Sequence, residues 1–118
     1  MILIKLMTNS NLFKPTKTSL LYMVTRIGGA RRKTRQKMTK SPQKRGKFSL
    51  RKYLQEFKMG DKVILKLESA VQKGMYFPRF HGKEGTVTEK QGRCYKIAIK
   101  DLKKEKIVIV HPVHLKRA

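Results

Sequence analysis

Acidic residues are scarce in this chain, and the scarcity limits what the chain can be. Its 118 residues include 7 Asp and Glu against 30 Lys and Arg, a formal net charge of +23. Self-repulsion of this size opposes a compact isolated state, so we expect the functional state to include a polyanion. Nucleic acid is favoured over a membrane surface, because the most basic stretch has no apolar face opposite its charges.

Cysteine and long apolar runs are also nearly absent. Cys94 is the single cysteine, so the chain cannot form an internal disulfide or a cysteine-based zinc site, which is typical of the reducing cytosol. No apolar run approaches the roughly 20 residues that span a bilayer. Residues 1–7 are apolar but interrupted by Lys5, and no small-residue cleavage pattern follows, so they are a poor signal peptide. We expect a cytoplasmic chain without a membrane partner.

The residues that catalysis requires are not brought together in the sequence. The acids stand singly, mostly beside lysines, as expected of surface charges that moderate repulsion. His111 and His114 lie three apart, but Pro112 disfavours a helix that would align them on a metal, and no further ligands cluster nearby. We therefore expect no enzyme, no metal, no cofactor and no small-molecule substrate.

Composition divides the chain into an arm and one small domain. Residues 1–22 carry three lysines and no acid, and we assign this N-terminal extension no function. Residues 23–48 carry ten basic residues, no acid and only isolated apolar side chains, so we expect them to be disordered in free solution and to become ordered on their partner. A solvated flexible tail is the alternative, and charge of one sign favours binding. Residues 49–118 hold the expected folded domain.

The domain is expected to be mainly β. Ser49 is a plausible N-cap for one short helix whose apolar face carries Leu50, Tyr53, Leu54 and Phe57. Alternation of apolar and polar residues then predicts short strands at 63–67, 86–88, 95–100, 107–110 and 114–116. Short antiparallel strands joined by glycine-containing turns favour a small closed barrel. The expected fold is an SH3-like small β-barrel with one short N-terminal helix and a long basic extended arm.

The arm is predicted to contact the RNA backbone. Guanidinium forks and long lysine side chains suit phosphate oxygens, and such contacts hold position without reading sequence. A nuclear localisation signal is the rival interpretation of the same run. The arm residues that we predict as RNA contacts are Arg26, Arg31, Arg32, Lys33, Arg35, Lys37, Lys40, Lys44, Arg45 and Lys47.

Residues 74–85 are a second candidate, because they interleave aromatic and basic side chains and end in glycines. Tyr76, Phe77 and Phe80 either stack on unpaired bases, worth about 1 to 3 kcal/mol per base, or fill the core, and the core is favoured for each. Gly82 and Gly85 have two compatible interpretations, close backbone approach to phosphate and positive φ in a tight turn. The RNA contacts that we predict here are Arg79, His81, Gly82 and Lys83.

A longer pattern carries a family resemblance. The sequence Gly-Asp-Lys-Val at 60–63 is followed, after ten residues, by Gly74 and then by Phe77, Phe80, Gly82 and Gly85. From residue 23 onward, about four-fifths of its length, the chain resembles the archaeal and eukaryotic large-subunit ribosomal proteins of the twenty-one-e family. The basic run 31–35 and the C-terminal residues 112–116 are similar to the corresponding parts of that family.

The resemblance implies more than composition does. It implies an SH3-like barrel whose basic extension packs into large-subunit ribosomal RNA, near the central protuberance and its small RNA, beside neighbouring large-subunit proteins. The expected function is that of a structural constituent of the cytoplasmic large ribosomal subunit. A non-ribosomal regulatory or chromatin-type nucleic-acid-binding factor is the alternative.

Overall fold

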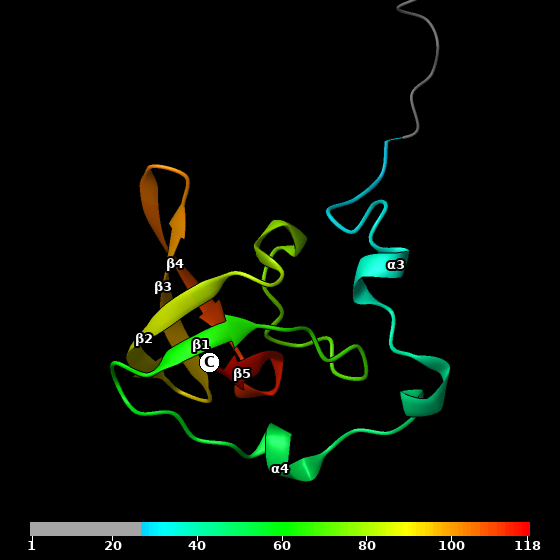
Figure 1. Cartoon of the computed structure of the whole chain (residues 1–118), viewed down its shortest axis with the longest axis horizontal. Coiled ribbons are helices and arrows are strands. Elements are labelled where there is room, and N and C mark those ends of the chain that lie inside the picture. The colour runs from blue at the N-terminus through cyan, green and yellow to red at the C-terminus, as the bar shows by residue number, and fades with distance from the viewer. Residues whose placement is uncertain (1–26) are drawn as a thin grey trace, which may run out of the picture.

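The computed structural model describes residues 27–118, which form an arm leading into a twisted antiparallel sheet (Figure 1). The arm contains the single helical turn α3 (Arg35–Met38) and the 3-10 turn η2 (Pro42–Lys44). The chain then passes beneath the sheet as α4 (Leu50–Tyr53). Two more 3-10 turns, η3 (Pro78–Phe80) and η4 (Pro112–His114), connect strands.

The sheet has five strands in the order β4-β3-β2-β1-β5, and every neighbouring pair is antiparallel. The strands are β1 (Lys62–Leu65), β2 (Glu84–Gln91), β3 (Cys94–Asp101), β4 (Lys104–Val110) and β5 (Leu115–Arg117). Each lies where alternation predicted a strand, so the mainly β architecture is confirmed. Within residues 27–118, β4 and β5 are edges that do not pair with each other, and closure into an SH3-like barrel is not confirmed.

The core lies on one face of this sheet, as the alternation requires. Val63, Leu65, Ile97 and Ile99 are at most 1% exposed, while the residues between them are half-buried or exposed. Val87, Val110, Val113 and Leu115 complete the apolar packing. Apolar burial on this scale is the main favourable contribution to the fold.

The aromatic residues of the 74–85 segment divide between core and surface. Tyr76 and Phe80 are buried, which confirms the core interpretation for both. Phe77 is 53% exposed, so the core interpretation is wrong for this residue. Its ring meets that of Phe80 edge to face, 6.3 Å between centroids, and its exposed side faces solvent.

The two glycines of this segment have different structural roles. Gly82 has φ +80°, and its N–H donates to the Leu65 carbonyl oxygen, so the tight-turn interpretation is right there. Positive φ is wrong for Gly85, which lies in β2. A Cβ at Gly85 would lie 2.5 Å from Cγ2 of Ile97 and 2.8 Å from the Ala98 carbonyl oxygen, so glycine is needed for close packing against β3.

The helix at residue 50 is shorter than expected. It has four residues, and Ser49 precedes it without a capping hydrogen bond from its side chain. Leu50 and Leu54 are 66% and 72% exposed, so the expected continuous apolar face is wrong. The side-chain amide of Gln55 explains the difference, since it donates to the Leu115 carbonyl at 2.8 Å and also to the Pro112 carbonyl.

Those hydrogen bonds extend the chain beyond the helix and bring Phe57 into the core. The Phe57 ring is 7% exposed and meets the ring of Tyr95 edge to face at 5.7 Å. The backbone N–H of Phe57 also donates to the Tyr95 hydroxyl at 3.3 Å. The segment between α4 and β1 is thus an extended connection across one end of the sheet. It places α4 and the arm beside the loop after β1.

Candidate nucleic-acid interface

Two contacts fasten the arm to the loop that follows β1, and we call them the arm anchor. Lys40 forms an ion pair with Glu68, and the Ser69 hydroxyl donates to the Met38 carbonyl oxygen at 2.6 Å. The Lys40 ammonium also donates to the Lys47 carbonyl oxygen at 2.7 Å. Glu68 is 9% exposed, so the expectation of a surface acid is wrong here. Disorder of the arm before it binds RNA stays a prediction.

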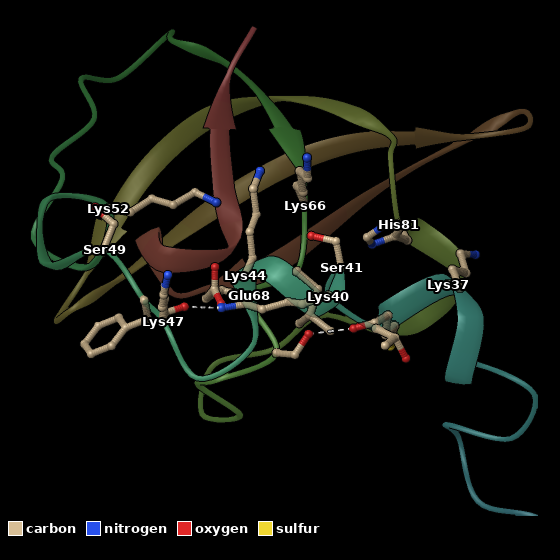
Figure 2. Close-up of a pocket in the computed structure, with 15 residues that line it drawn as sticks. Lys37, Lys40, Ser41, Lys44, Lys47, Ser49, Lys52, Lys66, Glu68 and His81 are labelled. Carbon is tan, nitrogen blue, oxygen red and sulfur yellow. Dashed lines mark hydrogen bonds and ion pairs between the residues drawn. The ribbon is translucent and has the colours of Figure 1, made fainter.

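The anchor creates a pocket between the arm, α4 and the loop after β1, with a volume of about 600 Å³ (Figure 2). We call it the lysine pocket. Among the described residues that line it, Glu68 is the only carboxylate, and Lys40 already pairs with it. The basic lining residues are Lys37, Lys40, Lys44, Lys47, Lys52, Lys66 and His81. Such an uncompensated excess of cations makes the pocket suitable for an anion.

The pKa values of two pocket residues are lowered mainly by burial, and neighbouring cations lower them further. Burial lowers the pKa of the Lys52 ammonium, and the nearby charges of Lys66 and Lys40 lower it further. Burial and then the charge of Lys37 lower the pKa of His81. Because like charges disfavour the protonated form, an anion in this pocket would relieve a cost that the free protein bears.

A second group of cations surrounds one buried acid, and we call it the Asp101 cluster. Asp101 is 5% exposed and accepts hydrogen bonds from Lys83 at 2.7 Å, Lys106 at 2.8 Å and Arg79 at 3.4 Å. The two ammonium groups also lie 5.5 and 5.6 Å from the centre of the Phe80 ring. The expectation of a solvated, isolated acid is therefore wrong, and Asp101 fixes the directions in which three cations point.

The free energy of unfolding should depend on the ionisation of Asp101. Hydrogen bonds from Lys106 and Lys83 lower the pKa of Asp101 from 3.8 to about 2. A depressed carboxyl pKa stabilises the fold above the unfolded-state value, and that stabilisation is lost as the pH falls from about 4 to about 2. We expect Asp101→Asn to unfold at lower urea than the unsubstituted chain at pH 5, and the two midpoints to converge near pH 2.

Glu89→Gln is the matched control, because this acid pairs with Lys96 on the surface and its side chain is 58% exposed. An exposed pair of this kind contributes little, so its urea midpoint should change little at either pH. A deficit of Asp101→Asn that stayed constant down to pH 2 would mean that packing, and not charge, explains the loss.

The structure brings together some of the predicted RNA contacts and separates others. Lys37, Lys40, Lys44, Lys47 and His81 meet at the lysine pocket, although the anchor occupies Lys40. Arg79 and Lys83 belong to the Asp101 cluster, and the N–H of Gly82 between them is taken by Leu65. The remaining arm residues, Arg31, Arg32, Lys33, Arg35 and Arg45, lie exposed along the arm. Arg26 lies outside the described residues.

Sequence reasoning missed three basic residues that belong to these groups. Lys52 lies in α4 and Lys66 directly follows β1, and both line the lysine pocket. Lys106 is a β4 residue that reaches Asp101. All three lie outside the basic arm in the sequence, so only the tertiary fold reveals their place.

The two histidines considered as metal ligands are structural. His114 is fully buried, its Nδ1 accepts from the Glu68 N–H at 3.1 Å, and its Nε2 donates to the Lys73 carbonyl at 3.2 Å. His111 Nδ1 accepts from the Val113 N–H. Among residues 27–118, no three metal-ligating side chains gather. Nor does this part of the chain contain a helix long and apolar enough to cross a membrane.

Comparison with known proteins identifies the family. The family model described as ribosomal protein L21e matches residues 24–118. The chain belongs to the L21e family. It is 46% identical over 96 residues to the large ribosomal subunit protein eL21 of Nanoarchaeum equitans, a match that covers 80% of this chain and 98% of that protein. The resemblance seen in the sequence is thereby confirmed.

Two further relatives give the same result. The chain is 42% identical over 95 residues to large ribosomal subunit protein eL21 of Thermoplasma acidophilum, covering 80% of this chain and 97% of that protein. It is 42% identical over 90 residues to the protein of the same name from Methanococcus vannielii, covering 76% and 93%. The L21e match includes the arm, the lysine pocket and the Asp101 cluster.

Proposed function

We propose that this L21e-family chain is a structural constituent of the large subunit of the cytoplasmic ribosome, where it binds and stabilises folded large-subunit ribosomal RNA. The observation that carries the proposal is the lysine pocket, in which cations from the arm and from the folded domain face one space with little acidic compensation. The relatives named large ribosomal subunit protein eL21 support the assignment to the subunit. The role requires no catalysis.

The two parts of the chain contribute differently to this role. The sheet is a rigid docking unit, and the exposed residues of the arm form an electrostatic strap along the RNA backbone. Contacts to phosphates fix position and release counterions, so affinity depends steeply on salt. The expected partners are large-subunit RNA, including the small RNA of the central protuberance, and the ribosomal proteins next to it.

We retain the SH3-like small barrel as part of the proposal. Five short antiparallel strands, with β1 between β2 and β5, support it. A register shift between Val87 and Glu89 also supports it, because a bulge of this kind bends a strand and increases the curvature of its sheet. Further bending in this direction would bring the two edge strands toward each other.

Sedimentation of a cell extract through a sucrose gradient after a high-salt wash tests the function. We expect the chain at stoichiometric level in the large-subunit peak, because a protein whose strap and pocket are enclosed by RNA is retained. A transient nucleic-acid-binding factor with six to ten phosphate contacts would weaken about a thousandfold or more between 50 and 200 mM salt. Release to the top of the gradient at moderate salt would therefore favour that alternative and contradict our proposal.

A further inference from the structure

The lysine pocket joins cations from separate parts of the fold, which distinguishes it from the linear run of charges along the arm. Lys44 belongs to η2, Lys52 to α4, and Lys66 directly follows β1, and all three line the pocket, whereas Lys116 lies in β5 outside its lining. The other three all act on the charge of Lys52 and lower its pKa, so they lie within electrostatic range of it. Figure 2 shows the side chains of Lys44, Lys52 and Lys66 extending into the pocket.

These lysines differ from Lys40 in how their charges are used. The Lys40 ammonium is occupied by Glu68 and by the Lys47 carbonyl, so it fastens the arm. Among residues 27–118, no carboxylate forms an ion pair with Lys44, Lys52 or Lys66. The pocket thus has an internal anchor and a separate set of cations that face the space it encloses.

The chemistry of the lining favours a nucleotide as the ligand. A phosphate concentrates negative charge on a few strong acceptor oxygens, which suits several convergent ammonium donors. Phe48 lines the same pocket, and its ring is 45% exposed, which offers a base a surface for stacking. A carboxylate ligand would use the cations but not the aromatic wall, whereas an RNA segment uses both.

We propose that the lysine pocket binds successive phosphates of an RNA backbone through Lys44, Lys52 and Lys66, and that Glu68 is a positioning residue that holds the arm over it through Lys40. This inference rests on the proposed function, because it names the place where the RNA backbone is held. It assigns binding roles to Lys52 and Lys66, which lie outside the arm. It also makes one acid of a strongly basic protein necessary for binding a polyanion.

Binding of a short oligouridylate to the full chain tests the phosphate contacts. We expect Lys52→Gln with Lys66→Gln to weaken binding about tenfold near physiological salt, and to lower the slope of log affinity against log salt by about 1.4, since each lost contact to single-stranded RNA contributes about 0.7. The matched control is Lys103→Gln with Lys104→Gln, an equal charge loss at two exposed residues at the tip of the β3–β4 hairpin. The control should weaken binding by less than about twofold, because it removes general attraction only.

Thermal unfolding separates a binding role from a structural one. Removing crowded cations should leave the free protein as stable as before or more stable, because Lys52 is held at a cost among like charges. If the double variant unfolds at a lower temperature than the unsubstituted chain, the oligouridylate affinity of Lys66→Gln alone tests the binding role. Lys66 is exposed, and folding does not depend on its charge. If the pocket variant and the control variant bound oligouridylate equally weakly and both unfolded at the normal temperature, the proposed role of the pocket would be overturned.

The role of Glu68 has the sharper test. Glu68→Gln raises the net charge, so charge counting alone predicts tighter binding to oligouridylate, whereas loss of the anchor predicts weaker binding. Glu89→Gln, which removes an exposed acid, should bind slightly tighter. Ser69→Ala removes the other half of the anchor at an exposed residue and should also weaken binding without unfolding the chain. Tighter binding of Glu68→Gln would overturn the positioning role.

A final comparison identifies the ligand and keeps this inference distinct from the proposed function. Inorganic phosphate should compete with oligouridylate only weakly, and equal affinity for the two would mean an anion site that is not specific for RNA. If the pocket variants bound oligouridylate as the controls do, only the pocket proposal would be refuted, and the sucrose-gradient result would still support the proposed function. Absence of the unsubstituted chain from the large-subunit peak would remove the proposed function itself.

Discussion

A chain in which Arg31, Arg35 and Arg45 are replaced by glutamine is expected to leave the large subunit during a high-salt wash that retains the unsubstituted chain. All three are exposed on the arm, so their loss would remove the proposed phosphate contacts without disturbing the core. Three lost contacts correspond to about a hundredfold weaker binding near physiological salt. Co-expression of substituted and unsubstituted chains, with both quantified across the gradient, measures the effect.

The control for this variant is a chain with Lys100, Lys103 and Lys104 replaced by glutamine, which loses the same charge from the β3–β4 hairpin. It should enter subunits normally. The thermal unfolding of both variants should match that of the unsubstituted chain, because neither change touches a buried side chain. Normal retention of the arginine variant would refute the electrostatic strap.

Replacing His114 by alanine is expected to cost about 2 to 5 kcal/mol of unfolding free energy. The imidazole is fully buried, and its two nitrogens satisfy the Glu68 N–H and the Lys73 carbonyl. Alanine leaves both backbone groups without these partners and leaves a cavity beside Tyr76, whose ring meets the imidazole edge to face. Urea unfolding at neutral pH measures the loss.

His114→Gln is the matched variant, because its amide offers one acceptor and one donor and should recover part of the loss. The pH dependence supplies a second check. Burial lowers the pKa of His114 below 6.5, so the folded state prefers the neutral ring, and its stabilisation is full above pH 6.5 and declines as the pH falls below it. A cost below about 0.5 kcal/mol for alanine would place His114 among ordinary surface positions.

The strands were predictable because their signal is local. Tyr95, Ile97 and Ile99 alternate with polar residues, and their burial in β3 follows from the two-residue period of a strand. The end of α4 was not predictable, because hydrogen bonds from Gln55 to carbonyls 57 and 60 residues away decide it. Helical spacing alone contains no information about such distant partners.

Part of the candidate site was likewise predictable from the sequence, and part was not. The charge of the arm indicated its lysines, but Lys52 and Lys66 join them only through the anchor that Glu68 makes with the arm. Asp101 is a hairpin-turn acid in the sequence, and its burial depends on where Arg79 and Lys83 lie in space. Solvent exposure of an acid in a basic chain is therefore a poor assumption where the fold brings several cations together.

The exposed edge of the described sheet affects the tendency of the protein to aggregate before it binds a partner. On β4, Ile107 and Ile109 are 68% and 49% exposed beside a backbone edge that no described strand covers. Such an edge favours aggregation between identical chains, and mutual repulsion at +23 opposes it. A polyanion shared by several copies cancels that repulsion while leaving their edges uncovered. Under the proposed function, newly made protein is therefore least prone to aggregate when its supply does not exceed that of the RNA that receives it.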